Sequence, residues 1–318
     1  MIVVTGAGGH LGQWVVAALT RAGHDVLCLS RRPADRPTIR GLAFARPVRT
    51  VGCDLADAAS VAAAAPVLAE ARAVVHLAAH IPVDTARNTD DDARAVLRAN
   101  VLGTAHLLAA LAQVPRLECV VYASTFEVYG TPVSQPVAED HPTRPASHYG
   151  ASKLAGEKYL RLFGDDRGVP CAALRLPAVY GPGETIRRAL GNFVRAAAEG
   201  RALELHGDGT DRRELVHAAD AADAVQRALE RRARGAFNVG SGSGPSIREM
   251  AEAVQRAAGG SVEIAMRPRV KPRLDYVLAI DRARRELGWE PRTTLDEGVR
   301  TQLAWVRGED WTGATGRA

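Results

Sequence analysis

The chain begins Met1-Ile-Val-Val-Thr-Gly-Ala-Gly-Gly-His-Leu-Gly12, where an apolar run breaks into glycines and then into a helical pattern. Residues 2–4 are β-branched, which is typical of a parallel strand buried on both faces. From Leu11 onward apolar residues recur at helical spacing, so the glycines lie where a strand end meets a helix N-terminus. This arrangement predicts a pyrophosphate site, because free backbone N–H groups at a helix N-terminus attract anions.

Three glycines in this stretch are spaced three residues apart. Gly6, Gly9 and Gly12 stand where a tight turn, a close backbone approach to a ligand and a close helix-on-strand contact each exclude a Cβ. The strand before them and the helix after them are the context that a dinucleotide-binding loop requires. The alternative is a glycine-rich turn without a ligand, in a chain that has 30 glycines.

Length and composition indicate a soluble globular protein. The 318 residues suit one large domain with a smaller lobe, or two domains. Of these residues 47% are hydrophobic and 24% are charged. No run approaches the roughly 18 to 20 apolar residues of a membrane span, so no membrane partner is expected. The first strand begins at residue 2, which leaves no room for a signal peptide and predicts a cytoplasmic location.

Charge and cysteine spacing exclude two further classes of site. The net charge of +5 comes from scattered arginines, with no basic block interleaved with aromatic residues, so nucleic-acid binding is not expected. The four cysteines are far apart, show no metal-ligand spacing and each lie in or beside a predicted strand. We therefore expect no metal site and four buried reduced thiols, at Cys28, Cys53, Cys119 and Cys171.

Short apolar runs alternate with amphipathic stretches along the chain. Strands are predicted at residues 2–4, 26–29, 48–52, 73–77, 118–123, 171–176 and 236–239, with helices between the first six. This alternation predicts an α/β fold with a doubly wound parallel sheet of the Rossmann type. We assign residues 1–178 and 213–239 to a dinucleotide-binding domain, and residues 179–212 and 240–318 to a smaller, discontinuous substrate lobe.

The end of the second predicted strand bears on the choice of dinucleotide. It reads Leu29-Ser30-Arg31-Arg32, whereas an NAD-selective site usually places an Asp or Glu there to hold the ribose hydroxyls. A hydroxyl followed by two guanidinium groups suits a 2′-phosphate instead, so NADP is favoured and NAD remains possible. The alternative is that arginine is simply the default base of this chain.

A phenol and an ammonium group stand one helical turn apart in Tyr149-Gly-Ala-Ser-Lys153. Lysine is scarce, since Lys153, Lys158 and Lys271 are the only ones. A phenol with a pKa of about 10 is a poor base at neutral pH, and a nearby cation lowers that value. Tyr149 is therefore a candidate general acid/base, and the alternative is an exposed helix pair.

The strand that ends in Val120-Val-Tyr-Ala-Ser-Thr-Phe-Glu-Val-Tyr-Gly130 presents hydroxyl and carboxylate residues at its carboxyl end, where open parallel sheets bind ligands. With this segment the chain resembles the extended short-chain dehydrogenase/reductase family of nucleotide-sugar epimerases, dehydratases, decarboxylases and reductases. The matching motifs in the first half are Thr5-Gly-x-x-Gly-x-x-Gly12, Cys53-Asp54-Leu55, His76-Leu-Ala-Ala79, Asn100-Val-x-Gly-Thr104, Ser124-Thr125, Tyr149 and Lys153. Those in the second half are Leu174-Arg-Leu-Pro-Ala-Val-Tyr-Gly-Pro-Gly183, Gly207-Asp-Gly-x-x-x-Arg213, Phe237-Asn-Val-Gly240 and Leu287-Gly-Trp-x-Pro291.

The resemblance implies a division of labour. Thr125 would hydrogen-bond the reacting sugar hydroxyl, Tyr149 would exchange its proton, and Lys153 would tune Tyr149 and hold the nicotinamide ribose. The residues expected to contact the cofactor are Gly6, Gly9, His10, Leu11, Gly12, Ser30, Arg31, Arg32, Asp54, Leu55, Leu77, Ala78, Ala79, Asn100, Tyr149, Lys153 and Pro177. Those expected to contact the substrate are His80, Ser124, Thr125, Arg213 and Lys271.

Three departures from the family pattern leave the reaction open. Glu127 follows the catalytic threonine as in nucleotide-sugar dehydratases and decarboxylases, and is a candidate catalytic residue. Phe126, however, replaces the Asp of many dehydratases, and Glu127 could merely bond a loop. The family's usual Asn is Ala178, and its second phosphate-binding Arg corresponds to Lys271.

Three functional classes follow from this pattern. The favoured one is an epimerase or dehydratase of a nucleotide sugar that keeps its cofactor, the next a reductase or dehydrogenase that exchanges it, and the last a cofactor-binding sensor. Helical patterns at residues 93–112 and 150–163 also predict a homodimer, although such apolar stripes could be ordinary core.

Overall fold

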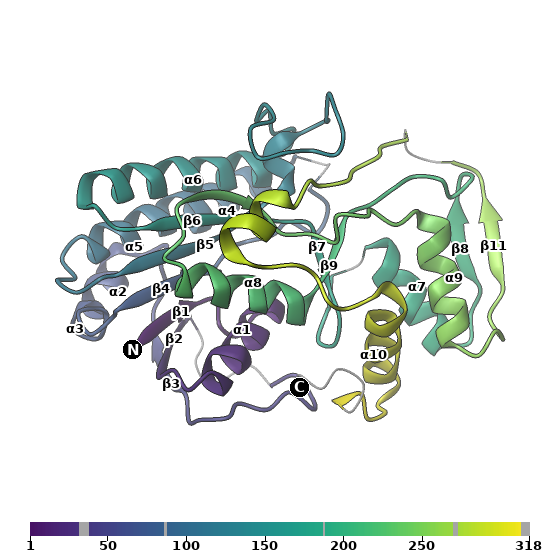
Figure 1. The fold of residues 1–318 in the computed structure, drawn as a ribbon, viewed down its shortest axis with the longest axis horizontal. Helices are drawn as coiled ribbons and strands as arrows, with labels where there is room; N and C mark the ends of the chain where they lie inside the picture. The colour runs from purple at the N-terminus through teal and green to yellow at the C-terminus, as the bar shows by residue number, and fades with distance from the viewer. Residues whose placement is uncertain (32–37, 86–87, 187, 270–272, 313–318) are drawn as a thin grey trace.

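A seven-stranded parallel sheet forms the centre of the protein. The structure is a computed structural model that describes residues 1–31, 38–85, 88–186, 188–269 and 273–312. The strand order is β10-β6-β5-β4-β1-β2-β3, which confirms the predicted doubly wound sheet (Figure 1). Its strands are β1 (Ile2–Thr5), β2 (Val26–Ser30), β3 (Arg49–Gly52), β4 (Ala73–His76), β5 (Cys119–Thr125), β6 (Cys171–Leu176) and β10 (Gly235–Asn238). All seven lie at the predicted apolar runs.

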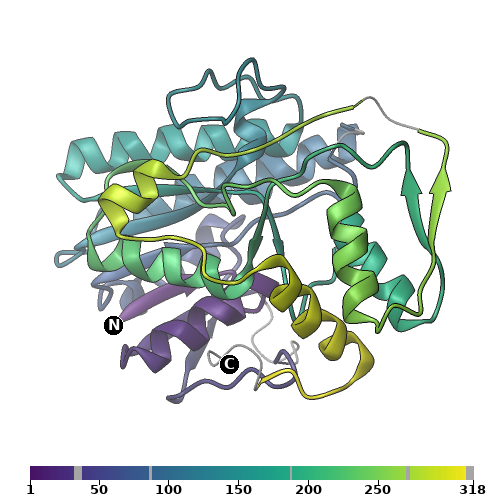
Figure 2. The same ribbon diagram turned by 45° about the vertical axis from the view of Figure 1, so that its right-hand side comes forward.

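Helices cover both faces of this sheet. One face carries α1 (His10–Arg21) and α8 (Ala218–Glu230), which pack against each other. The other carries α2 (Ala58–Ala63), α3 (Ala65–Leu68), α4 (Asp90–Val96), η1 (Leu97–Leu102), α5 (Gly103–Leu111) and α6 (His148–Arg167). Figures 1 and 2 show α6 running along the sheet on the side opposite α1.

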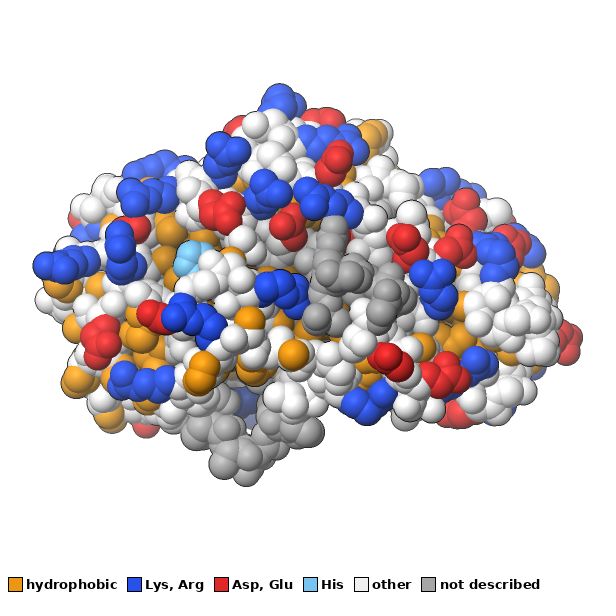
Figure 3. Space-filling view, turned by 60° about the horizontal axis from the view of Figure 1, so that its bottom comes forward, with side chains coloured by type: hydrophobic (Ala, Val, Ile, Leu, Met, Phe, Trp, Pro, Cys, Tyr) orange, Lys and Arg blue, Asp and Glu red, His pale blue; other side chains and the backbone are white. Residues whose placement is uncertain are grey.

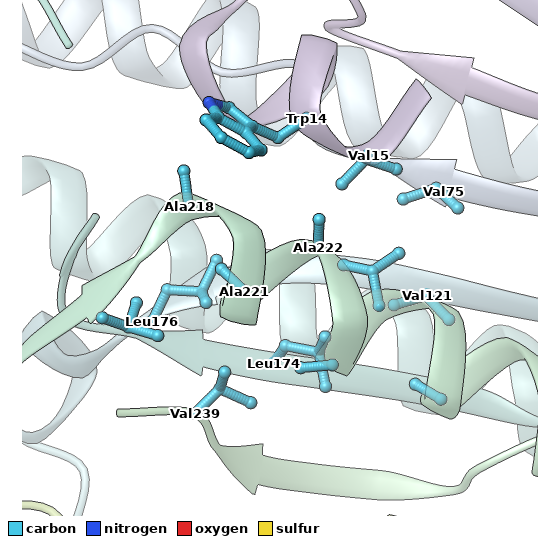
Figure 4. Packing of buried hydrophobic residues seen from close by; sticks show 14 of the residues in the cluster. Trp14, Val15, Val75, Val121, Leu174, Leu176, Ala218, Ala221, Ala222 and Val239 are labelled. Atoms are coloured by element: carbon cyan, nitrogen blue, oxygen red, sulfur yellow. The ribbon is translucent and has the colours of Figure 1, made fainter. Parts of the chain in front are cut away.

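Alternating side chains of each strand supply the two cores. Val3 and Leu27 point into one cluster with the leucines of α5, and Val4 points into the other with Trp14 of α1. Figure 4 shows Ala218 and Ala222 of α8 pointing toward Trp14 and Val15 of α1, so small residues allow the two helices to approach closely. Each fully buried Val or Leu stabilises the fold by about 1.5–3 kcal/mol relative to an exposed one, so burial on both faces stabilises these strands.

The cysteine prediction is confirmed. Cys28, Cys53, Cys119 and Cys171 are all buried and free, and burial raises the pKa of each thiol. They serve as small apolar side chains, three of them in strands of the sheet and Cys53 directly after β3.

A smaller group of elements lies at one end of the molecule (Figures 1 and 2). It contains β8 (Leu203–His206) paired with β11 (Ile264–Arg267), and the helices α7 (Ala189–Ala198), α9 (Ile247–Ala257) and α10 (Leu295–Arg307). These helices share a third hydrophobic cluster that includes Phe193, Met250 and Leu303. Capping boxes begin α9 at Ser246 and α10 at Thr294.

Two short pieces join this group to the sheet. Strands β7 (Ala178–Tyr180) and β9 (Leu215–His217) pair with each other where the chain passes between the central sheet and the smaller group of elements. Residues 276–289, which include η3 (Ala283–Leu287), pack into the core cluster on the α8 side of the sheet, although they fall in the predicted substrate lobe. The division into residues 1–178 with 213–239 and 179–212 with 240–318 stays a prediction.

The topology places a ligand site beside β1. The chain proceeds from β1 to β2 and β3 on one side and then returns to β4 on the other side of β1. In open parallel sheets, ligands bind at the carboxyl ends of the strands at such a reversal. Among the described residues, no helix is long and apolar enough to cross a membrane. Figure 3 shows basic and acidic side chains intermixed over one face of the molecule, as scattered arginines predict.

Candidate active site

The glycine loop between β1 and α1 has the geometry of an anion site. Gly6 has a φ of +68°, and a Cβ on it would lie 2.6 Å from the backbone nitrogen of Ala78. A Cβ on Gly12 would lie 2.2 Å from the Gly6 carbonyl oxygen. Gly9 is the N-cap of α1, and no side chain caps this helix and no acidic residue stands in its first turn. The first N–H groups of α1 are thus left for an anion.

A cavity of about 750 Å³ runs from this loop to the ends of β5 and β6 and to α6. It brings together most of the predicted site residues, which come from separate parts of the chain. Those that line it are Gly6, Gly9, His10, Leu11, Gly12, Ser30, Arg31, Asp54, Leu55, Leu77, Ala78, Ala79, Ser124, Thr125, Tyr149, Lys153 and Pro177.

Tyr149 and Lys153 reach the cavity from the first turns of α6. Ser147 is the N-cap of this helix, and its Oγ accepts a hydrogen bond of 2.9 Å from the Gly150 backbone nitrogen. Both side chains are buried, and the Lys153 Nζ lies 4.5 Å from the centre of the Tyr122 ring. The predicted pair is therefore internal and is not an exposed helix pair.

The electrostatics of this pair correct one expectation. The sequence predicts that Lys153 lowers the pKa of Tyr149, but burial, together with the charge of Glu127, raises it, and the cation that lowers it is Arg188. Burial also lowers the pKa of Lys153 to about 7, against the opposing charge of Glu157. Burial thus favours the neutral form of both groups.

Ser124 and Thr125 end β5 beside the cavity and differ in their free hydrogen-bonding capacity. The Ser124 hydroxyl donates to Glu157 Oε1 at 2.5 Å. Thr125 Oγ1 accepts from the Glu127 backbone nitrogen at 3.3 Å, as N-cap of η2 (Phe126–Tyr129), and keeps its proton to donate. Thr125 is therefore the better placed of the two to donate to a ligand oxygen.

Glu127 does not line the cavity. Its Oε2 accepts from the Ser147 hydroxyl at 2.7 Å, and its Oε1 lies 3.5 Å from the Thr85 hydroxyl. The carboxylate therefore bonds the start of α6 and the loop before α4. The predicted catalytic role of Glu127 stays a prediction, and its contacts match the alternative of a loop-bonding glutamate.

Asn100 and His80 also lie outside the cavity lining. Asn100 is buried in η1, and its amide donates to the Ser152 hydroxyl at 2.9 Å and to the His80 carbonyl at 3.0 Å. Its Oδ1 accepts from the His80 backbone nitrogen at 2.7 Å. Asn100 thus joins the loop after β4 to α6, and it supports the site without lining the cavity.

Arg213 lines a different hollow, of about 610 Å³, between α7 and β8. Its guanidinium lies 3.8 Å from Asp211, and Arg195, Arg201 and Arg269 line the same hollow. These guanidinium groups could bind an anionic part of a ligand. The predicted residues Arg32 and Lys271 lie outside the described residues.

The sequence reasoning missed two charged residues that line the main cavity. Glu184 is buried, accepts from the Gln302 amide at 2.6 Å, and has a pKa raised by burial to about 7. Arg188 is half-buried and acts electrostatically on Tyr149. Both follow β7 in a loop, where no periodicity reports the direction of a side chain, so only their charge could have drawn attention to them.

The residues present fit a dinucleotide. A Cβ on Gly9 would meet only the Gly6 oxygen, at 3.2 Å, so a ligand can approach this backbone closely. Ser30, Arg31 and Asp54 line the cavity, and so do Tyr149 and Lys153, so one ligand can reach from the end of β2 to α6. The arrangement can hold an extended diphosphate and place a proton-exchanging phenol at one end of it.

Known proteins are similar to this chain in sequence and in fold. Residues 2–240 match the family described as the NAD dependent epimerase/dehydratase family. The chain is 34% identical to a UDP-glucose 4-epimerase of Mycolicibacterium smegmatis over 96% of this chain and 98% of that one. It is 31% identical to a dTDP-glucose 4,6-dehydratase of Streptomyces griseus over 96% and 93%. The crystal structure of Thermus thermophilus UDP-glucose 4-epimerase in complex with NAD superposes with a TM-score of 0.81 at 31% identity, covering 96% of this chain and 99% of that one.

Proposed function

The chain belongs to the NAD-dependent epimerase/dehydratase family, and from this premise we propose that it is a nucleotide-sugar 4-epimerase. It removes hydride from carbon 4 of the sugar of a nucleoside diphosphate sugar and returns it to the other face. UDP-glucose, named in the epimerase relatives, is the first substrate to test.

The observation that carries this proposal is the single cavity shared by the glycine loop and by Thr125, Tyr149 and Lys153. When bound there, oxidised NAD supplies the hydride acceptor and a positive charge. The Thr125 hydroxyl would orient the sugar hydroxyl, and Tyr149, in its phenolate form, would take up the proton of that hydroxyl while carbon 4 is oxidised to a carbonyl. In the return step Tyr149 gives the proton back to the oxygen.

Lys153 assists by its charge and its place. Its ammonium lies over the Tyr122 ring, one turn of α6 from Tyr149, and faces the cavity. An ammonium group there can donate to the hydroxyls of the nicotinamide ribose, while the cation that lowers the pKa of Tyr149 is Arg188. Since the pKa of Lys153 is about 7, the residue gains or loses this charge near neutral pH.

The diphosphate of the substrate is assigned to the hollow around Arg213. Its four arginines come from α7, from the segment before β8, from the segment between β8 and β9, and from the segment after β11, and their guanidinium groups suit phosphate oxygens. We retain Lys271 as a predicted contact, and His80 and Ser124 as predicted contacts on the sugar side.

A 4,6-dehydratase is the second candidate, because the chain is also 31% identical to one. Glu127 would then act on the 4-keto intermediate. Its carboxylate is instead engaged with Ser147 and Thr85 outside the cavity lining, which favours epimerisation. A reductase or dehydrogenase that exchanges its cofactor remains the third candidate, and a sensor without chemistry the last.

The preference for NADP over NAD stays a prediction within an NAD-dependent family. Ser30 and Arg31 line the cavity at the end of β2, and Arg31 is exposed and free to turn toward a ribose phosphate. Titration of both oxidised forms into cofactor-free protein tests this choice, and equal or tighter binding of NAD contradicts it.

We also propose a homodimer built on η1 and α6. These neighbouring helices expose the large apolar side chains of Leu97, Leu102, Tyr159 and Leu162, at 47% to 56% of their surface. A second copy could cover this face. A monomeric mass by light scattering at micromolar concentration would contradict it. The cytoplasmic location also stays a prediction.

Incubation of UDP-glucose with the NAD-saturated protein tests the epimerase proposal. Proton NMR should show UDP-galactose accumulating, and Tyr149→Phe should abolish the change. Tyr159→Phe, an exposed phenol on the same helix, is the matched control and should keep wild-type turnover. A 4-keto-6-deoxy product would instead identify the dehydratase, and cofactor lost on gel filtration would favour the reductase.

A further inference from the structure

A buried ion pair lies directly beneath the cavity. Glu157 of α6 and Arg175 of β6 have side chains that are 8% and 7% exposed. The Arg175 Nε donates to Glu157 Oε1 at 3.0 Å and a terminal guanidinium nitrogen donates to Oε2 at 2.8 Å. The pair is therefore bidentate, which fixes the plane of both groups.

This pair is the centre of a hydrogen-bond network that joins five elements, α6, β5, β6, β10 and η2. Glu157 Oε1 also accepts from the Ser124 hydroxyl at the end of β5, at 2.5 Å. Arg175 donates to the Tyr129 hydroxyl at 2.8 Å, and Tyr129 donates to Asn238 Oδ1 of β10 at 2.7 Å. The carboxyl ends of β5, β6 and β10 are thus tied to one point on α6.

Glu157 lies one turn of α6 beyond Lys153. Residues four apart on a helix share a face, so Lys153 and Glu157 both face the sheet. Between them, a Cβ on Gly156 would lie 2.3 Å from the Tyr122 hydroxyl oxygen, so the helix touches β5 here without any spacer. Tyr122 is the residue whose ring lies under the Lys153 ammonium.

We propose that Glu157 is a positioning residue for the proposed reaction, on which this inference rests. Its carboxylate accepts from the Ser124 hydroxyl and thereby fixes the middle of α6 against the end of β5. Thr125, next to Ser124, and Lys153, one turn above Glu157, are thereby kept at fixed places around the cavity. Glu157 acts through these neighbours and does not line the cavity itself.

Stability alone gives no reason for an ion pair at this place. Two apolar side chains of similar volume fill a buried site at least as well, because they avoid the desolvation of two charges. What they cannot do is accept the Ser124 hydrogen bond or place a negative charge near Lys153. That charge raises the pKa of Lys153 against the effect of burial.

Few other ionisable groups near Lys153 supply such a charge. On β4, His76 is buried and has a pKa lowered to about 3, so it is neutral. On β5, Tyr122 is a buried phenol whose pKa is raised, and Tyr149 on α6 is another. Arg175 on β6 is already paired with Glu157. Glu157 therefore supplies the negative charge that favours the protonated form of Lys153 against the effect of burial.

Two variants separate positioning from a merely structural role. Glu157→Gln leaves Arg175 without its partner, whereas the double variant Glu157→Met with Arg175→Met removes both charges and restores packing. For each, the midpoint of urea unfolding, kcat and KM with UDP-glucose, and the titration of Lys153 are measured on NAD-saturated protein. Lysine labelled with ¹³C at Cε makes the titration direct, because the chain has only Lys153, Lys158 and Lys271.

Positioning predicts that the double variant recovers the unfolding midpoint but not turnover. Its kcat should stay roughly 10- to 100-fold low with KM nearly unchanged, and Lys153 should titrate at lower pH than in the wild type. Glu118→Gln, at the opposite end of β5, is the charge control and should match the wild type.

A double variant with wild-type kcat and an unshifted Lys153 titration would overturn the proposal. If the wild type acts on no nucleotide sugar, the proposed function has failed and the titration alone decides. A lower Lys153 midpoint in both variants then supports Glu157 as the residue that sets Lys153, and an unchanged midpoint overturns it.

Discussion

Two successive turns on one face of α6 bury polar groups in opposite ways. In the first, Tyr149 and Lys153 are buried beside the cavity, and no carboxylate among the described residues pairs with Lys153. In the second, Glu157 forms two hydrogen bonds with Arg175 and accepts a third from Ser124. In the first turn, burial disfavours the charged forms of Tyr149 and Lys153. In the second turn, hydrogen bonds from Arg175 and Ser124 stabilise the charge of Glu157.

This difference gives the two turns separate roles: the turn with Tyr149 and Lys153 supplies reactive groups, and the turn with Glu157 holds the helix against the sheet. Burial moves the pKa of Lys153 to about 7, so the protein forgoes stability to keep a labile proton at the site. Arg175 stays charged across the pH range in which Lys153 titrates, because Glu157 raises the pKa of the guanidinium against the effect of burial. Substitutions in the first turn should therefore cost activity and spare the fold, while those in the second should cost the fold first.

The largest expected effect is that of Tyr149→Phe. Turnover should fall by roughly 10²- to 10⁴-fold, because no proton acceptor remains for the sugar hydroxyl. The free energy of unfolding should be unchanged or slightly higher, since Phe buries no hydroxyl. Steady-state kinetics and urea denaturation measure the two, and turnover within a factor of three of the wild type would break the distinction between the turns.

Arg175→Met should have the largest effect on stability. Glu157 would be left buried without its partner, and breaking such a pair costs about 3–5 kcal/mol of unfolding free energy. Urea denaturation at pH 7 provides the measurement. A loss below about 1 kcal/mol would mean that the second turn is not held by its charges.

Lys153→Met should lower turnover and raise stability. The pKa of Lys153 is about 7 in the folded protein against 10.5 for an unperturbed lysine side chain, so the unfolded chain binds one more proton between these values. The stability of the wild type therefore rises with pH across this window, and the burial cost is fully present below pH 7. The variant should be more stable by on the order of 1 to 3 kcal/mol at pH 6, with the gap closing toward pH 10. Urea midpoints at both pH values test this, and an equal gap at the two would contradict it.

Arg188→Gln should give the smallest effect. Arg188 lowers the pKa of Tyr149 by its charge, so its removal raises that pKa and leaves less phenolate at neutral pH. Turnover at pH 7 should fall by roughly two- to tenfold and recover in part at higher pH. Arg227→Gln, on α8 and in the lining of neither the main cavity nor the Arg213 hollow, is the matched control for the pH profile. Identical profiles for the two variants would remove Arg188 from the site.

Local patterns were enough to predict the sheet and the spacing of the reactive pair. The β-branched run at residues 2–4 forms a buried strand as its composition predicts, and four residues along a helix bring Tyr149 and Lys153 to one face. The glycine loop was predictable for the same reason, since Gly6 and Gly12 are required by contacts within the loop and with the end of β4.

Side-chain directions and charges set by distant residues could not be predicted. Glu127 follows β5 as expected, but Ser147 and Thr85 draw its carboxylate out of the cavity lining. The raised pKa of Tyr149 comes from burial, which no spacing reports. The partner of Glu157 is Arg175, on another element, and neither residue stood out as part of the site.

The most direct test of the proposed chemistry follows the hydrogen on carbon 4 of the sugar. UDP-glucose deuterated at that carbon is mixed with one equivalent of NAD-saturated protein and quenched, and the released cofactor is analysed by mass spectrometry. We predict deuterium in the reduced cofactor of the wild type within one turnover, and none above background with Tyr149→Phe. Product formed without any transfer of deuterium to the cofactor would contradict hydride chemistry in this cavity, and equal labelling by Tyr149→Phe would contradict the role of Tyr149.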